Sequence, residues 1–197
     1  SNAWLAMDFV SGGDLDQYRG SRRLVPPADT LRVGLCVARA LQHAHAQGIV
    51  HRDIKPSNIL FDAAADTFKL ADFGLARLAD LQRSRTGVLA GTPAYMSPEQ
   101  LADSRQDARS DLYSLGVVLF ELLSGRLPYQ ASSLGVLLRQ LSSAEAPPVE
   151  ALPTATPERL RALVRRLLDR DQDRRPQTAD RVVEEVAAML DVLPNSG

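Results

Sequence analysis

Two segments of the sequence bring together acidic, basic and amide side chains that could support chemistry. Residues 51–60 read His-Arg-Asp-Ile-Lys-Pro-Ser-Asn-Ile-Leu, so Asp53, Lys55 and Asn58 fall within six residues. Nineteen residues after Asp53, Asp72 opens the sequence Asp-Phe-Gly. Carboxylate and amide oxygens bind hard cations such as Mg²⁺, a carboxylate can also accept a proton, and a lysine offsets negative charge. Taken separately, each segment has an ordinary interpretation, with Asp53 in a turn and Asp72 at the surface.

A third segment, residues 91–99, reads Gly-Thr-Pro-Ala-Tyr-Met-Ser-Pro-Glu. The order and spacing of the three segments together match the motif set of protein kinases. The chain therefore resembles the large, C-terminal lobe of a eukaryotic-type (Hanks-type) Ser/Thr protein kinase, from Trp4 to the last predicted helix. Ser97, where alanine is more usual, and a composition rich in Ala, Arg and Leu resemble the bacterial members.

The resemblance implies a role for each polar residue of the first two segments. Phosphoryl transfer has a loose transition state, so the protein mainly positions groups and neutralises charge. Asp53 would accept the proton of the substrate hydroxyl, and Lys55 would reach the γ-phosphate. Asn58 and Asp72 would hold Mg²⁺, and Thr92 would bridge Asp53 and Lys55. The cofactors implied are ATP and Mg²⁺, and the partner implied is a protein substrate.

Other residues of the resemblance have structural roles. Asp111 would accept backbone hydrogen bonds from the catalytic loop, in which His51 would be a packed structural residue rather than a base. Glu99 would pair with Arg175 in a buried ion pair. Gly74 would give the segment after Asp72 its backbone freedom.

Arg52 resembles the arginine of kinases that are controlled by phosphorylation of the activation loop. In those kinases the arginine pairs with a phosphate on the loop. The resemblance makes Thr86 the better candidate acceptor and Ser84 the second, because the phosphorylation sites of related bacterial kinases lie at similar distances before the residues that match 91–92. The alternative is that both are simply polar loop residues.

Residues 4–14 resemble the hinge behind the adenine ring of ATP. Met7 would be the gatekeeper side chain, and the Asp8 carbonyl and the Val10 amide would hydrogen-bond the base. Considered alone, this short apolar run is equally typical of an ordinary edge strand.

Three further residues would complete the nucleotide pocket. Asp14 would meet the ribose or a basic residue of the substrate. Leu60 would form the floor under the adenine ring. Ala71 would line the pocket directly before Asp72.

The elements that must position these residues are mainly helical. Apolar residues at spacings of three and four predict a helix from residues 26–29 to Gln47, with Gly48 as its stop. Short strands are predicted at 49–50, 59–61 and 68–70, and a long loop over 74–96. Two further helices are predicted over 110–124 and 132–141. Another would be capped by Thr156 with Pro157 as its first residue, and the last would begin at about Thr178. The predicted fold class is mainly α with short β-strands, an α+β C-lobe of the protein-kinase type with no N-lobe.

The predicted organisation is the remnant of a cleaved tag at 1–3, the hinge at 4–14, the C-lobe at 15–193 and a tail at 194–197. The sequence holds neither the G-x-G-x-x-G loop nor the V-A-I-K segment that kinases use over the phosphates. We therefore expect this chain alone to be inactive, and to self-associate through the apolar face that would meet an N-lobe.

Composition excludes several other classes of protein. The 197 residues suit one domain, with 45% hydrophobic and 24% charged residues. The formal net charge of −1 argues against a nucleic-acid partner, and the single cysteine rules out a disulfide framework. No run is apolar enough to span a membrane, so we expect a cytoplasmic location, with any membrane anchor of the parent protein outside this chain.

Two other functions remain as alternatives. A pseudokinase that acts as a binding scaffold would use the same fold, but pseudokinases commonly lack at least one of the polar residues found at 53, 55, 58 and 72. A small-molecule kinase with a similar lobe is the other alternative. Residues 91–99 and Arg175 count against it, because there the resemblance is to protein kinases.

Overall fold

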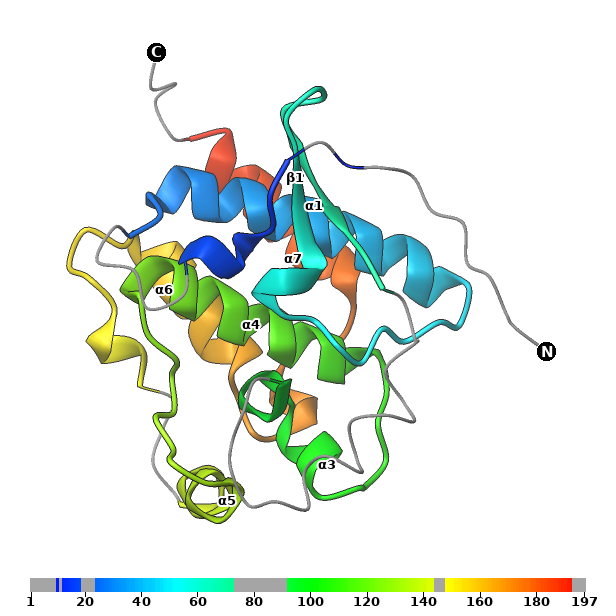
Figure 1. The fold of residues 1–197 in the computed structure, drawn as a ribbon. Helices are drawn as coiled ribbons and strands as arrows, with labels where there is room; N and C mark the ends of the chain where they lie inside the picture. The colour runs from blue at the N-terminus through cyan, green and yellow to red at the C-terminus, as the bar shows by residue number, and fades with distance from the viewer. Residues whose placement is uncertain (1–9, 11, 19–23, 73–91, 144–147, 193–197) are drawn as a thin grey trace.

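A computed structural model describes residues 10, 12–18, 24–72, 92–143 and 148–192 of the chain, and it is mostly helical with one small sheet (Figure 1). The longer helices are α1 (Pro27–Ala46), α4 (Ala108–Ser124), α5 (Leu134–Ser142), α6 (Glu158–Leu167) and α7 (Ala179–Leu190). The shorter elements are η1 (Leu15–Tyr18), η2 (Pro56–Asn58), β1 (Ile59–Asp62), β2 (Thr67–Leu70), η5 (Thr92–Tyr95), α3 (Pro98–Leu101), η6 (Val149–Ala151) and η7 (Gln172–Arg174). The predicted class, mainly α with short strands, agrees with this arrangement.

Helix α4 runs through the middle of the molecule, and every residue from Ser110 to Leu123 is buried (Figure 1). Helices α1 and α6 pack against it, and α7 packs against α1. A Cβ added at Gly116 would come within 2.7 Å of the Leu167 Cβ, so the glycine allows α4 and α6 to approach closely. A helix that is apolar nearly all round is typical of such a central position.

Several helix ends lie where turn and cap residues predict them. Gly48 and Gly125 have φ of 72° and 70°, the left-handed conformation that suits a residue after a helix. Thr178 caps α7 by accepting a hydrogen bond from the Arg181 amide. Helix α4 begins two residues before the predicted Ser110, because the Asp107 side chain accepts from the Arg109 amide and caps it there.

The predicted start of α6 is wrong by one residue. Pro157 has φ −57° and ψ 140°, which is extended, so it serves as the N-cap and the helix begins at Glu158. The Thr156 hydroxyl is buried and makes no hydrogen bond within the described part of the chain, so it does not cap the helix. Sequence spacing located the helix but not the conformation of its proline.

Strands β1 and β2 form an antiparallel hairpin in which Ile59 faces Leu70 and Phe61 faces Phe68. The predicted strand at Ile49–Val50 is absent. The Ile49 amide donates to the Ala44 carbonyl at the end of α1, so it is not available for a hydrogen bond to a neighbouring strand. The end of the predicted long loop is also more regular than expected, because residues 92–95 form η5. Within the described residues, no helix combines the length and the hydropathy needed to cross a membrane.

Candidate active site in the loop after α1

The loop that follows α1 is held in shape by one buried carboxylate on α4. The backbone amides of His51 and Arg52 donate to Asp111 Oδ2 and Oδ1 at 2.8 and 2.7 Å, the pattern that the sequence predicts. Arg52 has φ of 69°, an uncommon conformation for a residue with a side chain. Two charge-assisted hydrogen bonds at this point supply the free energy that keeps the turn in place.

The loop is also joined to the residues before Asp72. His51 Nε2 lies 2.9 Å from the Ala71 carbonyl oxygen, and the ring is buried, in keeping with a packed structural histidine. The Ala71 amide donates to the Asn58 carbonyl at 2.8 Å. The two motif segments are therefore neighbours in space, and the hairpin β1–β2 connects them.

Asp53 is the most constrained carboxylate of this loop. Its side chain is 7% exposed, and its Oδ2 lies 2.8 Å from Lys55 Nζ and 3.0 Å from Asn58 Nδ2. The same Asn58 nitrogen donates to the Asp53 carbonyl at 2.7 Å. Oδ1 is buried and has no hydrogen-bond partner among the residues that the structure describes. One oxygen is thus held by two donors, and the other is left to accept a proton.

Asn58 and Asp72 have the chemistry of a magnesium site. Because Asn58 Nδ2 is engaged by Asp53, the amide oxygen is the atom left for a cation. Asp72 is exposed and has φ of 62°. In the described part of the chain no three or more His, Cys, Asp or Glu side chains form a metal cluster. One or two oxygen ligands suit Mg²⁺, which takes its remaining ligands from phosphates and water.

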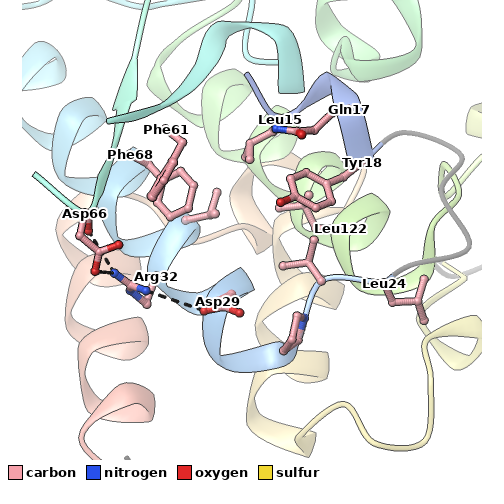
Figure 2. Close-up of a pocket in the computed structure, with 13 residues that line it drawn as sticks. Leu15, Gln17, Tyr18, Leu24, Asp29, Arg32, Phe61, Asp66, Phe68 and Leu122 are labelled. Carbon is pink, nitrogen blue, oxygen red and sulfur yellow. Dashed lines mark hydrogen bonds and ion pairs between the residues drawn. The ribbon is translucent and has the colours of Figure 1, made fainter. Parts of the chain in front are cut away.

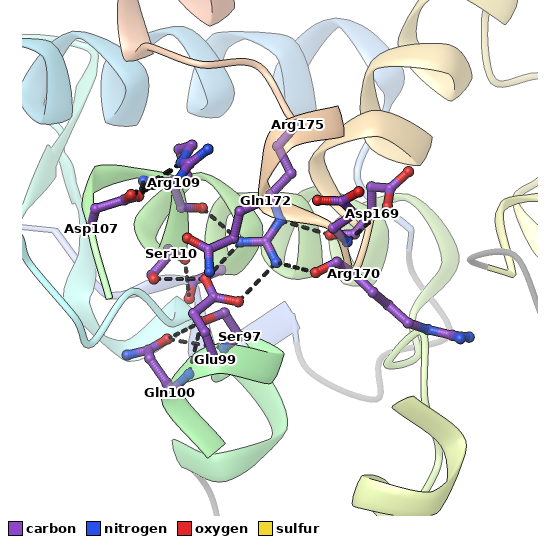
Figure 3. A network of polar contacts seen from close by, with 12 residues as sticks. Ser97, Glu99, Gln100, Asp107, Arg109, Ser110, Asp169, Arg170, Gln172 and Arg175 are labelled. Carbon is purple, nitrogen blue, oxygen red and sulfur yellow. Dashed lines mark hydrogen bonds and ion pairs between the residues drawn. The ribbon is translucent and has the colours of Figure 1, made fainter. Parts of the chain in front are cut away.

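The predicted pair of Glu99 and Arg175 lies against the first turn of α4 (Figure 3). Arg175 Nη1 and Nη2 donate to Glu99 Oε1 and Oε2 at 2.7 and 2.9 Å, and Ser110 Oγ donates to Oε1 at 2.7 Å. Burial alone would raise the pKa of Glu99, but the hydrogen bonds and charge of Arg175 outweigh it and lower that pKa. The guanidinium carbon also lies 4.9 Å from the centre of the Tyr113 ring, and burial raises the pKa of that tyrosine.

Helix α3 links this pair to the loop. Ser97 and Gln100 form a capping box at the start of α3. Gln100 Nε2 also donates to the Arg52 carbonyl at 3.0 Å. The network around Glu99 therefore reaches the same turn that Asp111 holds from the other side.

Sequence reasoning missed three side-chain contacts that anchor these segments to the helices. Tyr95 donates its hydroxyl to Glu121 Oε2 at 2.5 Å, and Ser114 Oγ donates to the Tyr95 carbonyl at 2.8 Å, so α4 holds η5. His45 Nε2 lies 2.8 Å from Asp111 Oδ2. A polar residue inside an otherwise apolar helix could have indicated such contacts, because a buried polar group nearly always has a hydrogen-bond partner.

The structure describes the remaining predicted site residues only in part. Asp14 forms a bridge to Leu60 and its carboxylate accepts from the Asp16 amide at 2.9 Å, while Val10 is half-buried. Thr92 begins η5, but its side chain is outside what the structure describes. The predictions for these five also lie outside the described residues: Met7, Asp8, Gly74, Ser84 and Thr86.

The helical fold around a buried α4, with this loop and the Glu99–Arg175 pair, is the arrangement that the motifs of protein kinases predict. A family model described as the protein kinase domain matches residues 1–186. The chain belongs to the protein kinase domain family.

Named relatives agree with this assignment. Serine/threonine-protein kinase pkn2 of Myxococcus xanthus is 39% identical over 195 residues, which are 95% of this chain and 23% of that protein. Serine/threonine-protein kinase pkn3 of the same organism is 35% identical over 94% of this chain and 36% of that protein. Serine/threonine-protein kinase PknL of Mycobacterium tuberculosis is 41% identical over 82% of this chain and 40% of that protein. The chain thus spans less than half the length of each of these relatives.

Proposed function

We propose that this chain is the catalytic C-lobe of an ATP-dependent Ser/Thr protein kinase. The observation that carries the proposal is the state of Asp53. Its Oδ2 is held by Lys55 and Asn58, and its buried Oδ1 has no partner within the described residues. A carboxylate oriented in this way can accept the proton of a substrate hydroxyl as that oxygen bonds to the γ-phosphorus and the bond to ADP breaks.

The neighbouring residues divide the other tasks of the reaction. Lys55 lies 2.8 Å from Asp53, so it can balance the negative charge on the transferred group while it holds the base in place. The Asn58 amide oxygen and the Asp72 carboxylate would hold Mg²⁺, which neutralises phosphate charge when it is bound. Thr92 would bridge Asp53 and Lys55. The presence of this full set argues against a scaffold that has lost catalysis.

The regulatory and nucleotide contacts are part of the same proposal. Arg52 Nε is buried and has no hydrogen-bond partner in the part of the chain that the structure describes. A phosphate on Thr86, or in second place on Ser84, would supply one. Residues 7, 8 and 10 would hold the adenine, with Leu60 beneath the ring and Asp14 near the ribose.

We further propose that these 197 residues alone do not transfer phosphate, since the sequence has no glycine-rich loop or V-A-I-K lysine. We expect self-association through the face that would meet an N-lobe, because apolar side chains of that face such as Leu60 would otherwise contact water. Light scattering that shows only monomer at high concentration would contradict the second point.

The main test compares the full-length protein with its Asp53→Asn variant in transfer of radiolabelled phosphate from Mg·ATP to a generic protein substrate. We expect a loss of about 10²- to 10⁴-fold in the turnover rate, the range for a general base. Asp103→Asn is the matched control, because Asp103 is exposed and its φ of 48° suits asparagine. Full activity in the Asp53 variant, at unchanged thermal stability, would refute the proposed base.

The metal site is tested separately on the 197-residue chain. Calorimetry with Mg·ATP is run on the wild-type chain and on Asp72→Asn. Binding that is present in the first and lost in the second would support the Asp72 ligand. Equal binding by both chains would contradict it.

A further inference from the structure

A cavity of about 390 Å³ lies between the β1–β2 hairpin, η1, α1 and α4 (Figure 2). Its walls come from η1, the residues before α1, the first turns of α1, the hairpin and α4. The apolar side chains that define it include Leu15, Tyr18, Leu24, Val33, Phe61 and Phe68. None of the residues proposed for catalysis or nucleotide binding lines it.

The charged groups of the cavity gather at one end (Figure 2). Arg32 Nη2 donates to Asp66 Oδ2 at 2.7 Å and to the Asp66 carbonyl at 3.0 Å. Arg32 Nη1 is 3.8 Å from Asp29 Oδ1, which is too long for a hydrogen bond. Two carboxylates therefore share one guanidinium. The side chain of Asp29 is 51% exposed, so it keeps most of its acceptor capacity for another group.

The cavity and the proposed metal ligands lie at opposite ends of one hairpin. Phe61 faces Phe68 across the strands, with ring centres 5.3 Å apart, and both rings line the cavity. Two positions nearer the loop, Ile59 faces Leu70, and these residues adjoin Asn58 and Ala71. A ligand that packs against the two phenylalanines would therefore contact the β1–β2 hairpin. The same hairpin adjoins Asn58 at one end and the residues before Asp72 at the other, and Asn58 and Asp72 are the proposed metal ligands.

We propose that this cavity binds a small molecule with an apolar body and a terminal amine. A site of this size lined mainly by aliphatic and aromatic groups, with a few polar groups at one end, is typical of small-molecule sites. The apolar body would replace water against Tyr18, Leu24 and Phe68. The ammonium would lie between Asp29 and Asp66, where the described side chains carry one negative charge in excess.

The test uses three probes that differ only in their end group: phenylbutylamine, phenylbutanol and phenylbutyrate. Dissociation constants come from amide NMR shifts of the 197-residue chain, so the result is independent of phosphate transfer. We expect the amine to bind about two- to fivefold more tightly than the alcohol, the range for a partly exposed ion pair. The carboxylate should bind most weakly, and the shifted amides should include those of Val33 and Phe68.

Two variants locate the site. Leu24→Trp should weaken all three probes by about tenfold, because the indole would fill space at the mouth. Leu138→Trp is its control, since Leu138 is a comparably exposed leucine on α5. Asp29→Asn with Asp66→Asn should reduce the affinity for the amine to that for the alcohol. The φ of 46° at Asp66 accommodates asparagine, and Glu184→Gln on α7 is the control for charge.

Three results would overturn the proposal: no shifts around the cavity, affinity for the amine no higher than for the alcohol, or unchanged affinity in Leu24→Trp. Tightest binding of the carboxylate would also overturn it. That outcome would mean that the positive charge of Arg32 dominates the potential in the cavity.

Discussion

The Glu99–Arg175 pair and the loop around Asp53 are both buried polar clusters beside α4, but they differ in how fully their hydrogen bonds are made. Arg175 has five N–H donors, and these reach the Glu99 carboxylate and the carbonyl oxygens of Arg109, Asp169 and Arg170 in five hydrogen bonds. In the loop, Arg52 Nε and Asp53 Oδ1 are buried without partners among the described residues.

The backbone shows the same contrast. Arg52 and Asp72 have positive φ, whereas Arg175 has φ −72° in ordinary extended backbone. Strain and unmade hydrogen bonds both cost stability, and they persist only where the surrounding structure holds them. The comparison therefore separates a cluster whose hydrogen bonds are complete from one that leaves buried polar atoms without partners, as the proposed function requires.

The largest effect is expected when the Glu99–Arg175 pair, whose hydrogen bonds are complete, is broken. Arg175→Ala should lower the free energy of unfolding by about 3–5 kcal/mol, because it leaves the Glu99 carboxylate buried without its cation. Arg174→Ala is the matched control: its side chain is 74% exposed and its ion pair with Asp171 spans 3.5 Å, so we expect almost no change. Denaturant unfolding measures both variants, and equal losses would contradict the contrast.

A smaller effect is expected where α4 holds the loop. Asp111→Asn replaces one carboxylate oxygen with a donor, so one of the His51 and Arg52 amides loses its acceptor. The expected loss is about 1–3 kcal/mol in the free energy of unfolding, with faster hydrogen exchange at the affected amide. Asp180→Asn should change little, because asparagine can still accept from Gln42. Unchanged exchange at both loop amides would contradict the role of Asp111.

Helix α3, which links the two clusters, is expected to contribute less to stability. Ser97→Ala removes the side-chain cap of α3, which also positions Gln100 against the Arg52 carbonyl. We expect a loss of about 1 kcal/mol, as for other N-cap serines. Ser142→Ala is the control, because that hydroxyl donates only to the Leu138 carbonyl on an exposed part of α5. Thermal unfolding of both variants would show whether the cap contributes.

The smallest expected effect is the change with pH in the stability that Glu99 contributes. The fold lowers the pKa of Glu99 from its ordinary value of 4.5, so the ionised carboxylate stabilises the folded state above that value. This contribution is lost as the pH falls through the lowered pKa. Glu99→Gln should therefore be less stable than the wild type at neutral pH, and the difference should narrow in acid. A difference that stays constant with pH would contradict the assignment.

Local patterns in the sequence predicted most of the helices. The spacing of Leu31, Leu35, Ala38 and Leu41 identified α1, and glycines marked the ends of α1 and α4. These signals succeed because amphipathic spacing and left-handed glycines act within a few residues. They failed at Ile49–Val50 and at Pro157, where a contact with the preceding helix end or the local proline conformation determined the outcome.

The sequence by itself determined the family, the motif residues and the partners of Asp111 and Glu99, since these depend on residue types in a known order. Only the tertiary structure decided which polar atoms are satisfied. Tyr95 meets Glu121 across 26 positions, and the apolar cavity forms where four separate elements converge. Burial makes such contacts necessary, but which groups meet depends on how the helices pack, and no local spacing encodes that.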